Sequence, residues 1–214
     1  MELNSSQQDI LYGMILGDAY LQKTGARNAR LRVEHSLKQK EYVEWKYQEL
    51  EHIFQSKPQC VQRIHPLTRR AYGYVRLQSY ASEFFGSLRN RFYQDNKKIV
   101  PIELEELFQN PLTIAVWYMD DGYHDKRDKS AHIYLQAFDV SEIQRIIDAF
   151  RTYLGIECKA YCRPDRQACQ LNFHNVHKDK LLALIEPHLI KSMRYKLPLD
   201  PVTTDPKSIQ TLVR

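Results

Sequence analysis

Two spacings of apolar residues divide the chain into helices and strands. Apolar residues at intervals of three and four predict amphipathic helices, and alternation of apolar with polar residues predicts strands with one exposed face. The predicted helices cover residues 6–17, 38–54, 81–93, 111–120, 141–154 and 176–184. The predicted strands cover residues 19–22, 30–37, 60–65, 72–79, a short stretch near 123, 132–138, 157–163 and 168–174. The order αββαββα therefore occurs twice, once in residues 1–101 and once in residues 102–214.

Acidic and basic residues occupy matching places in the two halves. Asp18 ends the first apolar helix, and Asp121 ends the corresponding helix of the second half. A lysine lies shortly before a proline near the end of both halves, at positions Lys98 and Lys196. A single aspartate at a helix end is commonly a solvated group or a turn acceptor. Its occurrence at the same place in both repeats favours a shared function.

The chemistry of two such helix ends suits a divalent cation. A helix C-terminus exposes backbone carbonyls and carries a partial negative charge, so a carboxylate there is poised to hold a cation. Hard oxygen ligands favour Mg²⁺, with Mn²⁺ as a substitute, over Zn²⁺. Metal ions held by Asp18 and Asp121 could stabilise the attacking and leaving oxygens of a phosphodiester. Lys98 and Lys196 could position the water and offset charge on the phosphate.

Length and composition narrow the class of protein. The chain has 214 residues, of which 43% are hydrophobic and 27% charged, as in ordinary globular proteins. The longest nearly apolar run, residues 112–119, is too short to cross a bilayer, so no membrane partner is expected. Residues 1–9 lack the features of a secretory signal or an organelle presequence. We expect the protein to stay inside the compartment that makes it, either an organelle (mitochondrion or chloroplast) or a bacterial cytoplasm.

The cysteines bear on redox compartment and on zinc. Four cysteines are too few for a dense disulfide framework, which favours a reducing compartment. Cys158, Cys162 and His174 could be imagined as zinc ligands, but their spacing lacks a paired C-x-x-C. We expect thiols at these cysteines and no zinc.

Basic residues concentrate in the predicted strands. The formal net charge is +5, and residues 55–82 contain five Lys or Arg and no acid. A solvated sheet face normally mixes Lys with Glu, whereas these strands alternate aliphatic residues with Arg, Tyr, Gln and His. That composition favours phosphate contacts and hydrogen bonds to base edges over a merely solvated face. The candidate DNA contacts are Arg30, Arg32, Arg63, Arg70, Tyr72, Arg76 and Gln78 in the first half, and His132, Tyr134, Gln136, Arg163, Arg166, Asn172 and His174 in the second.

Two segments resemble the motifs of a known family. Residues 11–19 read LYGMILGDA and residues 114–122 read IAVWYMDDG, and both resemble the motifs of a single-chain LAGLIDADG homing endonuclease. The resemblance covers nearly the whole chain, because the order of elements and the segments NKKIVP and YKLP also match. It implies an α+β fold of two αββαββα halves related by pseudo-twofold symmetry. The motif helices would pack side by side, and each half would offer a curved antiparallel sheet to the DNA major groove.

The resemblance also implies an activity and a set of site residues. The expected activity is that of a monomeric, Mg²⁺-dependent, site-specific endonuclease, which hydrolyses one phosphodiester in each strand of a long asymmetric duplex site. The residues carried over are Asp18 and Asp121 as metal ligands, Gly17 and Asp120 through carbonyls near the metals, and Lys98 and Lys196 as the basic pair. Small residues are present at the expected helix crossing in the first motif, at Gly13 and Gly17, but the matching places in the second motif hold Val116 and Asp120, which predicts asymmetric packing.

Two other interpretations remain beside this one. Residues 118–121, YMDD, also match a box of reverse transcriptases, but here they close an apolar helix and have a partner at Asp18. The second alternative keeps the scaffold with a different function, either that of a maturase-like protein that binds its own intron RNA or that of a DNA-binding regulator that does not cut. The complete set of two acids and two lysines favours the nuclease.

Overall fold

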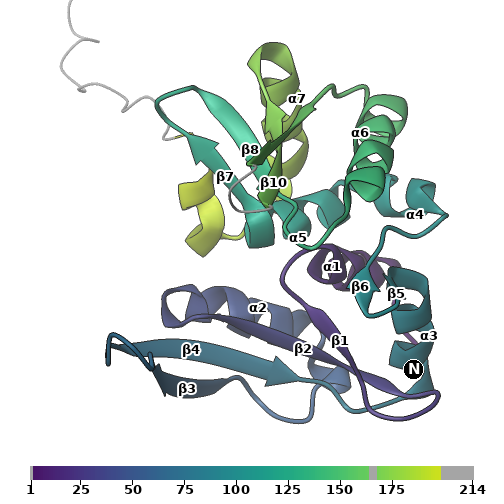
Figure 1. Ribbon diagram of the computed structural model, residues 1–214, viewed down its shortest axis with the longest axis vertical. Helices are drawn as coiled ribbons and strands as arrows, with labels where there is room; N and C mark the ends of the chain where they lie inside the picture. The colour runs from purple at the N-terminus through teal and green to yellow at the C-terminus, as the bar shows by residue number, and fades with distance from the viewer. Residues whose placement is uncertain (1, 164–167, 199–214) are drawn as a thin grey trace, which may run out of the picture.

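The computed structural model describes residues 2–163 and 168–198 and consists of two halves joined along a central pair of helices (Figure 1). Each half contains a four-stranded antiparallel sheet, with strand orders β1-β2-β4-β3 and β7-β8-β10-β9. The central helices are α1 (Ser5–Leu16) and α5 (Pro111–Asp121), which lie side by side between the sheets. The predicted α+β fold of two similar halves is confirmed.

The elements follow one another in the same order in both halves. The first half continues with β1 (Tyr20–Lys23), β2 (Ala29–Ser36), a 3₁₀ turn η1 (Leu37–Gln39), α2 (Lys40–Glu49), a 3₁₀ turn η2 (Glu51–Ile53), β3 (Gln59–Ile64), β4 (Ala71–Gln78), α3 (Glu83–Phe92), β5 (Tyr93–Gln94) and β6 (Lys97–Lys98). The second half contains α4 (Leu104–Phe108), α5, β7 (Gly122–Asp125), β8 (Ser130–Tyr134), α6 (Val140–Leu154), β9 (Lys159–Arg163), β10 (Ala168–Phe173), α7 (Asn175–Ile185), η3 (Glu186–His188) and η4 (Lys191–Lys196).

Several predicted boundaries were wrong. The helix expected to reach residue 54 ends at Glu49 and is followed by a 3₁₀ turn. The strand expected over residues 132–138 ends at Tyr134, because the chain turns where the Phe138 amide donates to the Leu135 carbonyl. The β5–β6 hairpin and α4 were not predicted, since elements of two to five residues carry too little periodicity to be recognised.

The central helices begin at recognisable caps. Asn4 caps α1 by accepting a hydrogen bond from the Gln7 amide, while the Gln7 side chain bonds back to the Asn4 amide. Asn110 caps α5, and Pro111 occupies the first helical position, where a missing N–H is least harmful. Both helices are then buried on nearly every side, so they read as uniformly apolar rather than amphipathic.

The crossing of α1 and α5 is close and asymmetric, as predicted. A Cβ placed on Gly13 would lie 2.6 Å from the Thr113 carbonyl oxygen, and one on Gly17 would lie 2.5 Å from the Asp120 side chain. The glycines at these positions belong to α1 and its C-cap, and α5 places Val116 and Asp120 against them. The close approach of the two backbones therefore depends on α1.

The cysteines correct one expectation. Cys162 and Cys169 form a disulfide between β9 and β10, where we expected thiols. The two residues are directly opposite in the antiparallel pair, which brings their Cβ atoms close enough to bond. Cys162 is thereby removed from the zinc set considered above, and Cys60 and Cys158 are free. Among the described residues, no helix is long and apolar enough to cross a membrane.

Candidate active site

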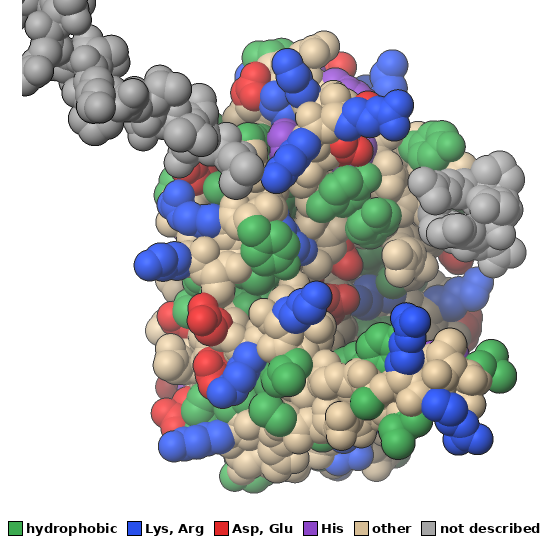
Figure 2. All heavy atoms as spheres, turned by 90° about the vertical axis from the view of Figure 1, so that its left-hand side faces the viewer, with side chains coloured by type: hydrophobic (Ala, Val, Ile, Leu, Met, Phe, Trp, Pro, Cys, Tyr) green, Lys and Arg blue, Asp and Glu red, His purple; other side chains and the backbone are tan. Residues whose placement is uncertain are grey.

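The two motif acids meet where the central helices end. Asp18 follows the C-terminus of α1 with its side chain 43% exposed, and Asp121 is the last residue of α5. Both line an open cleft of about 810 Å³, which Lys98 and Tyr134 also border. Figure 2 shows Lys and Arg side chains on both halves and a hollow between them. The structure thus brings together two acids that are far apart in the sequence.

Each predicted lysine binds the carbonyl that precedes one of these acids. The Nζ atom of Lys98, on the short strand β6, donates to the Gly17 carbonyl at 2.7 Å. The Nζ atom of Lys196, at the end of η4, donates to the Asp120 carbonyl at 2.8 Å. The two halves therefore repeat the unit of carbonyl, acid and lysine. The carbonyls expected near the metals lie at the site, with a lysine bound to each.

Burial and neighbouring carboxylates raise the pKa values of the two motif acids. Burial and the nearby charge of Asp18 raise the pKa of Asp121 to about 8. Burial and the charge of Asp120 likewise raise the pKa of Asp18. Burial lowers the pKa of Lys196 to about 8 and also lowers that of Lys98, although the acids oppose both shifts. A divalent cation bound by Asp18 and Asp121 would favour the carboxylate form of both acids and so lower their pKa values.

A buried lysine that sequence reasoning missed lies behind this site. Lys46 of α2 is completely buried, and its Nζ donates to Asp120 Oδ1 at 2.7 Å and to His35 Nε2 at 2.9 Å. Since an ammonium group has no acceptor, His35 Nε2 must accept, which leaves the proton on Nδ1. Nδ1 then donates to Gln39 Oε1 at 3.1 Å and lies 3.5 Å from Asp18 Oδ2.

The ionisation states in this network follow from burial and pairing. Burial and the charge of Lys46 lower the pKa of His35 to about 3, so the imidazole is neutral at pH 7. Burial alone would raise the pKa of Asp120, but the positive charge of Lys46 and its hydrogen bond to Asp120 outweigh burial and lower that pKa. Asp120 is therefore a carboxylate with Lys46 as its counter-ion.

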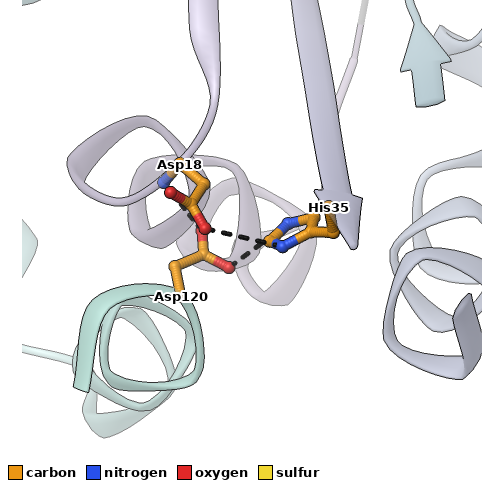
Figure 3. A group of neighbouring side chains, drawn as sticks. All are labelled: Asp18, His35 and Asp120. Carbon is orange, nitrogen blue, oxygen red and sulfur yellow. Dashed lines mark hydrogen bonds and ion pairs between the residues drawn. The ribbon is translucent and has the colours of Figure 1, made fainter. Parts of the chain in front are cut away.

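Asp18, His35 and Asp120 form a cluster whose negative charge is already partly balanced by Lys46. One ligand atom each from Asp18, His35 and Asp120 lies within 4.8 Å of the others (Figure 3). The Lys46 ammonium, however, already bonds two of these three groups and supplies the positive charge. The carboxylates of Asp18 and Asp121 line the cleft, and their hard oxygens could hold Mg²⁺ or Mn²⁺.

The sequence contains a signal for Lys46 and His35, the two buried site residues that were not predicted. Lys46 falls on the buried stripe of α2 together with Tyr42 and Val43, where an apolar residue is normal. His35 is on the buried face of β2, two residues after Val33 on the same face. A lysine and a histidine at core positions indicate a buried acid partner, but the local pattern does not say which acid.

Most of the first-half candidates share the polar face of one sheet. In the register of the sheet, Arg32 lies opposite Gln78, Glu34 opposite Arg76, and Arg63 opposite Tyr72. Arg30 lies opposite Gln22 on the same face, and Arg70 lies in the loop before β4. A hollow of about 200 Å³ joins this face to Asp18.

Glu34 partly neutralises the positive charge of that face. Glu34 binds Arg63 at 2.7 Å and also Arg76 at 3.1 Å, so these two guanidinium groups are already paired. Arg32 bonds to Gln22 at 3.4 Å and has no carboxylate partner among the described residues. Arg32 therefore retains capacity for a new anionic partner, unlike Arg63 and Arg76.

The second-half candidates are less uniform. Tyr134 is exposed on β8, opposite Gln170, and Asn172 of β10 lies opposite His132. His132 is buried, where it bonds Ser130 at 2.7 Å and Asn172 at 2.6 Å, so it supports the sheet face rather than projecting from it. The remaining candidates are Gln136 in a turn, His174 at the N-cap of α7, Arg163 at the end of β9, and Arg166, which lies outside the described residues.

Comparison with known proteins places the chain in a family. Residues 8–178 match the model of the LAGLIDADG DNA endonuclease family. The chain belongs to this family. The similar proteins include a probable intron-encoded endonuclease 1 of Wickerhamomyces canadensis, 26% identical over 91% of this chain and 85% of that protein. The cytochrome b mRNA maturase bI2 of Debaryomyces hansenii is 22% identical over 91% of this chain and 74% of that protein.

Solved structures agree with this LAGLIDADG assignment. The homing endonuclease I-WcaI, solved bound to its DNA recognition sequence, superimposes with a TM-score of 0.83 and 25% identity over 92% of this chain and 88% of that chain. The YMDD segment lies at the end of the helix α5, as predicted above. The double LAGLIDADG motif accounts for it.

Proposed function

We propose that this LAGLIDADG protein is a site-specific DNA endonuclease that uses a divalent metal, with Mg²⁺ first, to hydrolyse one phosphodiester in each strand. The observation that carries the proposal is the pair of carboxylates, Asp18 and Asp121, in one cleft between two sheets. Each follows a carbonyl bound by a lysine, so the site offers two reaction centres, each with one acid and one lysine. Two centres match the two strands of a duplex.

The proposed roles follow from position and charge. Asp18 and Asp121 hold the metal, beside the carbonyls of Gly17 and Asp120. When bound, the metal supplies Lewis-acid stabilisation of the phosphate oxygens. Lys98 and Lys196 offset phosphate charge, and the lowered pKa of Lys196, about 8, suits it to orient a water and exchange a proton at Nζ.

The target is proposed to be a long, asymmetric DNA duplex bound by one copy of the protein. The two halves, which we place at residues 1–101 and 102–214, carry different side chains on their sheet faces, so each would contact different bases. The similar I-WcaI was solved on its DNA recognition sequence, which supports duplex DNA as the partner. The roles of individual sheet residues as DNA contacts remain part of this proposal.

A second candidate function is the binding of intron RNA. The similarity to the Debaryomyces hansenii maturase favours it, and one scaffold can serve both functions. Salt-sensitive binding is expected in either case, so affinity alone does not distinguish the two functions.

The deciding experiment is cleavage of a randomised duplex library, followed by sequencing of the ends. It is run with Mg²⁺, with Ca²⁺ in its place, and with the double variant Asp18→Asn, Asp121→Asn. Double-strand breaks at one sequence with Mg²⁺, lost in the variant, would establish the endonuclease and its site. Absence of breaks, with structured intron RNA competing better than duplex DNA, would favour the maturase.

A further inference from the structure

The two motif acids lie on backbone segments of different conformation. Asp121 belongs to α5, so its amide lies within the helix. Helix α1 instead ends at Leu16, and Gly17 turns the chain away with φ −86° and ψ −131°. The Gly17 amide donates to Gly13 and the Ala19 amide to Met14, which leaves the Asp18 amide between them without a helical acceptor.

The carboxylate of Asp120 supplies that acceptor from the other half. Its Oδ2 accepts a hydrogen bond from the Asp18 amide at 3.1 Å, and its Oδ1 is held by Lys46 at 2.7 Å. Both side chains of this ion pair are fully buried. The approach requires Gly17, because a Cβ there would lie 2.5 Å from Asp120 Oδ2. One carboxylate therefore joins α5, the end of α1, and α2.

We propose that Asp120 and Lys46 are a positioning pair, which fixes the backbone of Asp18 so that its carboxylate faces the cleft. Asp120 orients Asp18 through the amide, and Lys46 holds Asp120 in the one rotamer that reaches it. Neither side chain touches substrate or metal. The second centre needs no such pair, because α5 itself carries Asp121. The effect on cleavage rests on the proposed function, whereas the effect on the Asp18 amide does not.

A positioning role and a merely structural role predict different results. If the pair contributes only to stability, any neutral replacement that packs well should give the same exchange rate of the Asp18 amide and the same cleavage rate. If Asp120 positions Asp18, the replacement must keep an oxygen that accepts the amide hydrogen bond. Neutralising both members together avoids an unpaired buried charge, so both kinds of variant should fold.

The test compares two double variants that differ in that oxygen. Lys46→Met, Asp120→Asn retains an acceptor, and Lys46→Met, Asp120→Leu has the same branched shape, at a larger volume, without one. Lys46→Met, Asp120→Ala gives the same comparison with a smaller side chain if leucine prevents folding. The direct readout is hydrogen exchange of the Asp18 amide by NMR, in protein without DNA or metal. We expect protection in the wild type and the Asn variant, and exchange at least tenfold faster in the Leu or Ala variant.

Single-turnover cleavage gives the functional readout. A misplacement of about 1 Å costs on the order of 100-fold in rate, so we expect about that loss in the Leu or Ala variant. The Asn variant should retain a rate within several-fold of the wild type, and DNA affinity in Ca²⁺ should be unchanged in all. Equal exchange rates in the Asn and Leu variants would overturn the proposal, and so would equal cleavage rates in these variants of a wild type that cuts DNA. If the wild type does not cut DNA but the exchange difference is found, the proposed function fails while the positioning pair stands.

Discussion

Removal of the buried cation at Lys46 should destabilise the protein strongly. The Lys46 ammonium lies 2.7 Å from Asp120 Oδ1 and 2.9 Å from His35 Nε2, with no exposed surface on its side chain. Lys46→Met keeps an unbranched side chain of similar reach and removes the charge. Asp120 is then a buried carboxylate without a counter-ion.

The size of the effect follows from the geometry. At a separation of 2.7 Å, two unit charges attract by about 6 kcal/mol for an effective dielectric constant of about 20. Desolvation of both ions offsets much of this attraction in the wild type, but the variant keeps the buried carboxylate and loses its compensation. Breaking one side of a buried pair typically costs about 3–5 kcal/mol, and we expect a loss in this range at pH 7.5. Adding Asp120→Asn should restore most of it.

Urea unfolding monitored by circular dichroism measures this loss, with Lys40→Met as the matched control. Lys40 lies on the same helix and pairs with Glu44, but both side chains are about half exposed, so its loss should stay within about 0.5 kcal/mol.

The dependence on pH gives a second check. In the wild type the pKa of Asp120 is lowered, so the pair stabilises the fold above the pKa of the unfolded chain and less as the pH falls. In Lys46→Met, burial should instead raise that pKa, so the deficit should shrink toward pH 4. A deficit below about 1 kcal/mol at pH 7.5, or one that grows on acidification, would refute the reasoning.

Three further predictions test other parts of the site. Gly17→Ala should destabilise by at least about 2 kcal/mol and abolish cleavage, because its Cβ would overlap Asp120, whereas Gly25→Ala, with its nearest neighbour at 3.9 Å, should be neutral in the same unfolding assay. Because the pKa of Asp121 is raised to about 8, the folded protein holds a proton there that the unfolded chain releases at lower pH, and the free energy of unfolding falls as the pH rises toward 8. This proton must leave when Mg²⁺ binds. Calorimetry in buffers of different ionisation enthalpy should therefore show proton release below pH 8, which Asp121→Asn reduces. Arg32→Ala should weaken DNA binding and reduce the salt slope by about 1, while Arg151→Ala on α6, which pairs with Asp148, should change neither; equal slopes for both variants would count against the sheet face as the DNA contact.

Local patterns were sufficient for much of the fold. The repeat αββαββα, the two acids at helix ends and the two lysines before prolines all depend on spacing within a few residues, which sequence periodicity reports directly. The alternation in β2 and β4 also placed Arg32 and Arg76 on one face, as the strand register confirms. Strand ends were less predictable, because Tyr134 ends β8 through hydrogen bonds made by the following turn and not through its own propensity.

What the sequence by itself determined is the family, the two-half architecture and the pairing of one acid with one lysine in each half. Only the tertiary structure decided that Asp120 does not face the cleft beside Asp121. It is instead a buried carboxylate held by Lys46, 74 residues away in the sequence. The physical reason is that a buried charge acquires its state from partners within a few ångströms, and those partners are set by how α1, α2 and α5 cross. The same crossing makes the two acids, equivalent in the repeat, unequal in the folded protein.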